Sequence, residues 1–579
     1  MEMKRIVRGL GVMAFVAAAA SCHSLDVTNP NEPDARRALS DPNAIEAVAG
    51  GALRTWFNAY TSLRGAGVLD AQARNYSSSW NNGNLNFYSS IDNPTDPPDK
   101  WNRMSRTWQN DPAAAARTSI DAFWGGGLDE SAVVRGGFYT ALSAANTALL
   151  AIRKNNLVIR NTADTKRTET IATFMQGASL MMFALQYDKA YVVDENSDIA
   201  TLQYSNRKVV RDSAVSKLQQ AIALANANTF TTPAAWDGPN GVSYTNTQIA
   251  QIANTMAAMT LAYYPRDNTE VAAVDWAKVA SFASKGMSSG TPFDFFFSQD
   301  GYTNWISELM NWFDGIDGGR MSTRIAHFLD PATQVDPWPL TGNPQPNSAD
   351  KRLGDGSFGD AGTADNFGTT PFTGNGGTDF AWSGVAIFRP ARGQYHQSNI
   401  AQIRYDFTKT MDSKGQYGGF GPAPLILATL NDLLWAEALL RQSTPSVAQA
   451  VSLIDKTRVG RGGLPSAAVN AGVGSDADGP CMSTGVKAKD GTPCTLWSML
   501  IYEKEIELPG LGPAPFWEER RLPLIIGGGY SGDNSPKRVI QGLLPGTPRE
   551  MPVPYKELGV KGETLYTWGG STPNSPPPQ

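Results

Sequence analysis

Apolar side chains recur at steps of three and four residues along much of this 579-residue chain. Phe138, Leu142, Ala145 and Leu149 show the pattern, and residues at this spacing fall on one face of an α-helix. A helix is also expected from Asp41-Pro42 to about Tyr60, because proline is favourable at a helix start. The same spacing continues through residues 174–185, 215–225, 249–259, 276–283, 426–437, 447–454 and 497–506. The pattern therefore predicts about nine helices.

Alanine is frequent at the packing positions of these expected helices, as at Ala145, Ala178 and Ala253. Small side chains let antiparallel helices approach closely, and stacked helix pairs form an α-solenoid of the tetratricopeptide type. No strict repeat of about 34 residues is present, so any such repeats are degenerate. We expect a mainly α-helical protein with a tetratricopeptide-like helix-pair solenoid as scaffold and long irregular loop excursions.

Two long regions break the helical pattern, residues 61–135 and 290–424. Both are rich in Gly, Pro, Asn, Asp and aromatic residues. Irregular stretches of this length inside a compact protein are uncommon and are usually functional. We expect one domain over residues 38–579, in which the helical scaffold covers about 38–60, 136–289 and 425–510. The two irregular regions are the candidate ligand-facing parts.

The N-terminal residues have the pattern of a secretory signal peptide. Three basic residues precede an apolar run from Leu10 to Ala20, and small residues end it at Ser21. The run is too short to cross a bilayer as a helix, which takes about 20 apolar residues. Residues 1–21 are thus an expected signal peptide, and residues 22–37 are a polar tether.

Cys22 follows the small residues directly, and this arrangement resembles the lipobox of bacterial lipoproteins. The resemblance implies cleavage before Cys22 and lipidation of its thiol and new amino group, and two or more acyl chains anchor a protein stably. The alternative is an ordinary signal peptide with an incidental cysteine. We favour the lipoprotein, because the Ala-Ser-Cys triplet stands where cleavage is expected.

Charge, cysteine and histidine content bear on three properties: nucleic-acid binding, a disulfide and metal binding. The formal net charge of −5 becomes −7 without residues 1–21, and such a surface does not favour nucleic acid. Cys481 and Cys494 lie 13 residues apart in a Gly/Asp/Pro-rich segment, which in an oxidising compartment predicts a disulfide that closes a loop. Two free thiols or a metal site are the alternatives. With three histidines and no paired ligand spacing, we expect no metal and no cofactor.

Aromatic residues and asparagines gather in the two irregular regions. Aromatic rings can cover the apolar face of a sugar while amide side chains bond its hydroxyl groups. The alternative is that these rings anchor long loops onto the scaffold. The candidate ligand-binding residues are Tyr76, Trp80 and Trp101 in the first region and Asn304, Trp305 and Trp312 in the second.

Several ordered blocks of sequence span nearly the whole chain behind the lipobox. They are Cys22–Asn31, Tyr139–Ile152 with Ala145-Asn146, Phe174–Tyr187, Leu425–Arg441 with Trp435-Ala436-Glu437-Ala438, Ile454–Leu464, Glu503–Leu508, Phe516–Arg521, Met551–Pro554 and Glu557-Leu558. Each block is weak alone, but together and in this order they resemble the SusD/RagB family of surface lipoproteins in bacterial nutrient-uptake systems. The sequence departs from the family at Pro509–Pro513, where Pro and Gly end a helix early.

The resemblance implies a lipid-anchored protein on the outer face of the outer membrane. It further implies a TonB-dependent SusC-like barrel as partner, to which the protein delivers captured oligosaccharide or another nutrient without catalysis. A surface glycoside hydrolase and a non-catalytic envelope scaffold protein are the alternatives. A glycosidase pair at Glu503 and Glu507 is unfavourable, because residues four apart on a helix are neighbours on one face. We expect these two carboxylates to belong to the scaffold, with Arg520 and Arg521 near enough to pair with them.

Overall fold

The computed structural model describes residues 39–79, 85, 108–109, 123–125, 136–300, 305–312, 319–334, 344–354, 377–382, 397–404, 420–469, 471–481, 492–523, 543, 549–564 and 566–568. The expected signal peptide, the tether and Cys22 lie outside these residues. The domain boundaries proposed from the sequence therefore stay a prediction.

The predicted helices form close to the positions that the apolar spacing indicates. The first one, α3 (Pro42–Tyr60), begins after Asp41, whose carboxylate accepts a hydrogen bond from the backbone N–H of Asn43 at 2.9 Å. At the start of α10 the side chains of Thr245 and Gln248 cap each other's backbone N–H groups. The other long helices are α7 (Phe138–Leu149), α8 (Thr162–Gln186), α9 (Arg207–Ala227), α10 (Asn246–Ala262), α12 (Trp276–Ala283), α15 (Ala428–Leu440), α16 (Val447–Arg458), α17 (Leu496–Glu507) and α18 (Ala514–Arg521).

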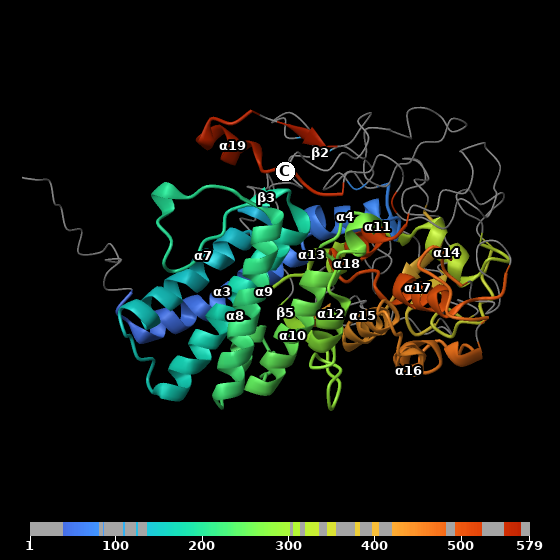
Figure 1. Cartoon of the computed structure of the whole chain (residues 1–579), viewed down its shortest axis with the longest axis horizontal. Helices are drawn as coiled ribbons and strands as arrows, with labels where there is room; N and C mark the ends of the chain where they lie inside the picture. The colour runs from blue at the N-terminus through green and yellow to red at the C-terminus, as the bar shows by residue number, and fades with distance from the viewer. Residues whose placement is uncertain are drawn as a thin grey trace, which may run out of the picture.

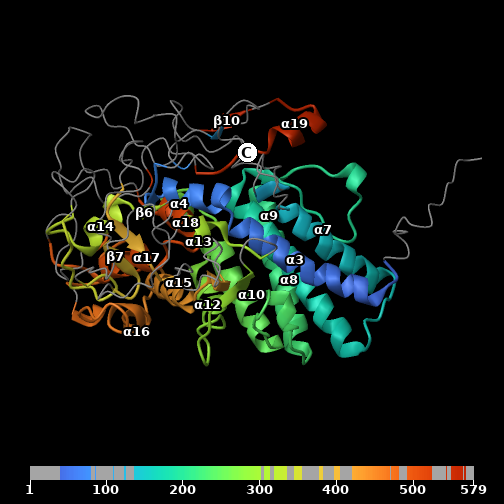
Figure 2. The same cartoon turned by 180° about the vertical axis from the view of Figure 1, so that it is seen from behind.

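These helices pack in chain order, as in a helix-pair solenoid. α3 contacts α7, α7 contacts α8, α8 contacts α9 and α9 contacts α10, after which α12, α15 and α16 continue the series. Both views show α7, α3, α8, α9 and α10 side by side, with α16 and α17 towards the other end (Figure 1; Figure 2). A Cβ on Gly177 of α8 would lie 2.7 Å from Leu218 of α9, so the absence of a side chain permits this close approach. The fold class predicted from the sequence is confirmed.

Short antiparallel strand pairs hold segments that are far apart in the chain. The longest joins β5 (Phe295–Asp300) to β9 (Phe420–Ile426), which brackets the second region predicted as irregular. The described parts of the two irregular regions also hold short helices, among them α4 (Val68–Gln72), α13 (Glu308–Trp312) and α14 (Thr323–Leu329). The other strand pairs are β1 (Tyr76–Ser77) with β6 (Arg320–Met321), β2 (Trp108–Gln109) with β10 (Thr567–Trp568), β3 (Lys189–Ala190) with β4 (Ser205–Asn206), and β7 (Phe380–Trp382) with β8 (Ile400–Gln402).

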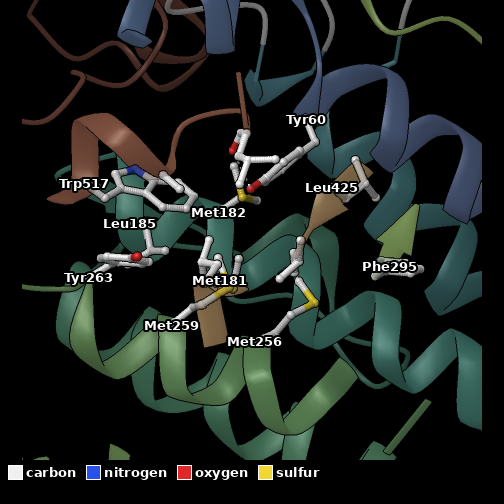
Figure 3. Packing of buried hydrophobic residues seen from close by; sticks show 14 of the residues in the cluster. Tyr60, Met181, Met182, Leu185, Met256, Met259, Tyr263, Phe295, Leu425 and Trp517 are labelled. Atoms are coloured by element: carbon white, nitrogen blue, oxygen red, sulfur yellow. Dashed lines mark hydrogen bonds between the residues drawn. The ribbon is translucent and has the colours of Figure 1, made fainter. Parts of the chain in front are cut away.

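The hydrophobic core continues from the solenoid into the C-terminal helices. Figure 3 shows Met181 of α8 facing Met256 and Met259 of α10, while Trp517 of α18 lies close by. All four side chains are fully buried. Flexible methionine side chains fill irregular gaps between helices, so they suit a junction where elements from both ends of the chain meet.

Candidate functional site

Two of the predicted ligand-binding rings are buried in the core. Tyr76 lies in β1 opposite Met321 and is 1% exposed. The ring of Trp305 is 9% exposed and stacks on Phe297 with ring centres 5.4 Å apart. A ring enclosed in this way has no free face for a sugar, so the structure gives Tyr76 and Trp305 a packing role. For these two residues the alternative stated above, loop anchoring, describes the structure better.

The remaining predicted site residues are not placed together by the structure. Trp312 is the last residue of α13, and the described part of the chain does not extend to its side chain. Trp80, Trp101 and Asn304 lie outside the described residues, as does Cys22. Their predicted roles in ligand binding and lipidation therefore stay predictions.

A disulfide joins Cys481 and Cys494, whose Cα atoms are 5.6 Å apart. Both cysteines are buried, at 0% and 3% exposure. Their backbones are held as well, because the N–H of Cys481 donates to the carbonyl of Ser498 in α17 at 2.8 Å. The bridge thus ties the loop before α17 to that helix. Oxidation of the pair in the cell stays a prediction.

Glu503 and Glu507 of α17 are both fully buried beside Arg352. The Nη1 atom of Arg352 donates to Glu503 Oε2 at 2.7 Å and to Glu507 Oε1 at 2.9 Å, and its Nη2 atom donates to Asp350 Oδ2 at 2.7 Å. Buried charges need partners and hydrogen bonds of this kind to offset the loss of hydration. These carboxylates are therefore scaffold, and they are enclosed rather than arranged around a cleft.

Arginines set the charge of Glu507. Burial raises the pKa of Glu507, but the guanidinium groups of Arg404, Arg352 and Arg461 outweigh it and lower the pKa to about 2. Arg404 Nη1 donates to Glu507 Oε2 at 2.6 Å, and Arg461 Nε donates to Oε1 at 2.9 Å. At Glu503 burial prevails over the arginines, and the pKa is raised. Neighbouring carboxylates on one helix thus have opposite shifts.

The expected pairing of Arg520 and Arg521 with Glu503 and Glu507 is wrong. Arg521 instead forms a buried ion pair with Glu437 of α15 and another with Glu518 at 2.7 Å. Arg520 donates to backbone carbonyl groups, at 2.6 Å to that of Leu185. The reason is that a turn with left-handed Gly510 and Gly512 separates α17 from α18, so the two helices are not continuous. Arg520 then reaches α8, and Arg521 reaches α15.

A groove of about 700 Å³ runs across α9, α10 and α12. Each helix presents one stripe of residues at i, i+3, i+4 and i+7 to it, which is the spacing of one helix face. Figure 1 and Figure 2 show the three helices as neighbours. The lining residues are Gln219, Ile222, Ala223 and Asn226 of α9, Thr247, Ala250, Gln251 and Asn254 of α10, and Lys278, Ser281, Phe282, Lys285 and Ser289 of α12 and the segment after it.

Polar groups of the groove are only partly used by the protein. Asn254 is 6% exposed, and its Nδ2 atom donates to the carbonyl of Ala250 at 2.8 Å. Gln251 donates from Nε2 to the carbonyl of Ser289 at 2.6 Å. In both residues the amide oxygen accepts no hydrogen bond from the described part of the chain. The groove therefore offers acceptors as well as the two lysine donors.

The described residues offer no site for a metal and no membrane span. No group of three or more His, Cys, Asp or Glu side chains there is placed to hold a metal ion. Among the helices of the described residues, none is long and apolar enough to cross a membrane.

Comparison with known proteins identifies the fold. A SusD homolog from Bacteroides thetaiotaomicron superposes with a TM-score of 0.51 at 12% identity, over 91% of this chain and 98% of the other. Surface glycan-binding protein A from Bacteroides uniformis superposes with a TM-score of 0.50 at 12% identity, over 91% of this chain and 99% of the other. This chain has a SusD-like fold. No family model and no curated protein matches the sequence.

The SusD-like fold gives the sequence blocks a physical meaning. Three of the blocks, Leu425–Arg441, Glu503–Leu508 and Phe516–Arg521, each supply a member of the buried ion-pair networks. These members are Glu437, Glu503 and Arg521. Lys504 of the second block lies between the first and third, and its Nζ atom donates to Glu518 at 2.9 Å and to Glu437. The blocks that carry the resemblance therefore specify the scaffold.

Sequence reasoning missed the residues of the groove. One signal was present, because α9 and α12 each carry two or three polar residues in a stripe at i, i+3, i+4 and i+7 beside their apolar stripe. Such a polar stripe is typical of any solvated helix face, however. Only the packing of α10 between its two neighbours turns three such stripes into one concave surface.

Proposed function

We propose that this protein is a lipid-anchored cell-surface protein that captures oligosaccharide, or another nutrient, and delivers it to a TonB-dependent SusC-like transporter in the outer membrane. The observation that carries the proposal is the SusD-like fold over 91% of the chain. Of the two solved proteins compared above, one is named a surface glycan-binding protein. The signal peptide and Cys22 expected from the sequence supply the means of anchoring.

The proposal requires binding and no covalent chemistry. The most conspicuous pair of carboxylates, Glu503 and Glu507, is fully buried and engaged by arginine, so it is not available to a substrate. A glycoside hydrolase would need two carboxyl groups on either side of a bound sugar. The structure therefore supports a binding protein over the hydrolase alternative at this position.

The test has two independent parts. A C-terminally tagged protein, solubilised from native outer membranes in mild detergent, is expected to co-purify with a barrel transporter. The Cys22→Ser variant, which is expected to leave the membrane, is the control for barrel that is recovered non-specifically. Separately, a glycan array with the lipid-free protein should identify a bound oligosaccharide, and product analysis should show no cleavage. Recovery of the tagged protein without any barrel would contradict the transport role. Hydrolysis of a bound glycan would favour the enzyme alternative.

A further inference from the structure

The groove across α9, α10 and α12 has the size and walls of a ligand site. Its volume of about 700 Å³ lies within the range of roughly 300–1,000 Å³ that is usual for small-molecule sites. Small side chains are part of its lining, among them Ala250 of α10 and Ala223 of α9. The helices that carry the lining residues are held together, because α10 packs against both α9 and α12.

The groove carries positive charge without a balancing carboxylate in its lining. Lys278 and Lys285 are seven residues apart, two helical turns, and both side chains are exposed on the wall formed by α12 and the turn after it. None of the thirteen lining residues is Asp or Glu. Neither lysine forms a salt bridge within the described part of the chain. A chain with a formal net charge of −5 thus presents a local cationic site.

The other lining groups suit a sugar. Asn254 and Gln251 line the groove, and their amide oxygens accept no hydrogen bond from the described part of the chain. An amide oxygen of a lining residue can accept a hydrogen bond from a ligand or from water. Sugar hydroxyl groups are donors of this kind. Phe282, with Lys278 Nζ 6.0 Å from its ring centre, is 9% exposed and belongs to the packed core beneath this wall.

We infer that this groove binds an acidic oligosaccharide, whose carboxylate groups pair with Lys278 and Lys285 while its hydroxyl groups donate to Asn254 and Gln251. The inference rests on the proposed function in that the captured nutrient is a glycan, and it adds the ligand class and the site. An acidic peptide is the other anionic ligand that the lysines would attract. We favour the sugar because the fold is shared with a surface glycan-binding protein, and tetraglutamate tests the peptide.

The test measures binding to the lipid-free full-length protein by calorimetry. The probes are tetragalacturonate, tetramannuronate, methyl-esterified tetragalacturonate, which has the same sugar without the charge, and tetraglutamate. We expect at least one uronate to bind, with esterification and the Lys278→Gln/Lys285→Gln variant each weakening binding about tenfold or more. Affinity should also fall between roughly 0.05 M and 0.5 M salt, since salt screens exposed charges.

Two matched controls separate the groove from general effects. Lys208→Gln removes another exposed lysine, which belongs to α9 and lies outside the groove, and should leave affinity unchanged. Ala223→Trp should block the groove, whereas Ala200→Trp, at another exposed position, should not. Thermal melting checks that each variant folds. Because all five substitutions lie at exposed positions, we expect the folded state to survive.

Each outcome decides the inference. Equal affinity for the acid and its ester, unchanged affinity in the double lysine variant, or lysine-dependent binding of tetraglutamate as tight as that of the uronates would overturn it. So would failure of both uronates to bind. The proposed function is tested separately by co-purification of the barrel and by the glycan array, so a neutral glycan bound outside the groove would contradict the inference while leaving that function standing.

Discussion

Arg352 donates to Glu503 at 2.7 Å across 151 residues of sequence, and both side chains are fully buried. This ion pair connects the segment around residue 350 to α17, the helix that also carries Glu507. Removing one member of a buried pair leaves the others charged, desolvated and unpaired, which is why such a change is more harmful than loss of a surface pair.

Arg352→Met should therefore destabilise the protein by about 3–5 kcal/mol. Urea denaturation measures the change, and Lys208→Ala is the control, since that lysine is 68% exposed and its loss should cost no more than about 0.5 kcal/mol. Adding Glu503→Gln to Arg352→Met should cost less than the sum of the single changes, because the two residues interact directly. Strictly additive effects would show that the pair contributes nothing specific.

Stability should fall as pH rises because of Asp237, which is 3% exposed. Burial raises the pKa of Asp237 to about 8, although a hydrogen bond from the Val242 N–H at 2.8 Å opposes this. In the unfolded chain the carboxyl group titrates near pH 4. Between these values the folded state holds a proton that the unfolded state has lost, so this contribution is complete below about pH 4 and disappears by about pH 8.

Asp237→Asn should remove that dependence. Its stability relative to the wild type should be similar at pH 5 and higher by about 1–3 kcal/mol at pH 8, as measured by urea denaturation at both values. Asp212→Asn is the control, because Asp212 is exposed and has a lowered pKa, so it stays ionised across this range. A constant difference between the Asp237 variant and the wild type at the two pH values would rule out the shifted pKa.

The Cys481–Cys494 bridge should be oxidised in protein taken from the cell surface, which mass spectrometry can establish directly. Replacing both cysteines by serine should lower the free energy of unfolding by at most about 3 kcal/mol, because the loop is short. The backbone bond from Cys481 to Ser498 should keep the loop near α17. Two free thiols in native protein would contradict the prediction.

Replacement by alanine should affect stability at Trp305 but ligand affinity at Trp80 and Trp101. Trp305→Ala should destabilise the fold by about 3–5 kcal/mol, because its ring is buried against Phe297 and Phe57. Trp80→Ala or Trp101→Ala should instead weaken ligand binding by roughly 1–3 kcal/mol at an unchanged melting temperature. Wild-type affinity in both would make these rings loop anchors too.

Cys22→Ser should release the protein from the membrane, because lipid at this residue is the expected attachment and an acylated anchor needs its thiol. Fractionation of cells in high salt, in a strain without the partner barrel, measures this. A neighbouring His23→Ala variant serves as the control and should stay membrane-bound. If the Cys22→Ser protein still sediments with the outer membrane, the lipoprotein interpretation is wrong.

The sequence by itself determined the helices, because their signals are local. Phe138, Leu142, Ala145 and Leu149 lie on one face within a few turns, and the cap at Asp41 involves its immediate neighbours. Local spacing also indicated close helix packing, which Gly177 against Leu218 illustrates. The ordered sequence blocks indicated the SusD-like fold, which the structural comparison shows.

Tertiary structure alone decided which charges meet and where a surface is hollow. The sequence predicted that Arg520 and Arg521 pair with Glu503, but left-handed Gly510 and Gly512 separate their helix from α17. Arg352, 151 residues away in sequence, pairs with Glu503 instead. Likewise Lys285 and Asn254 share a groove only because α10 packs between α9 and α12. Periodicity reports which face of a helix is apolar, whereas contacts between distant segments depend on how whole helices are arranged, and no local pattern encodes that arrangement.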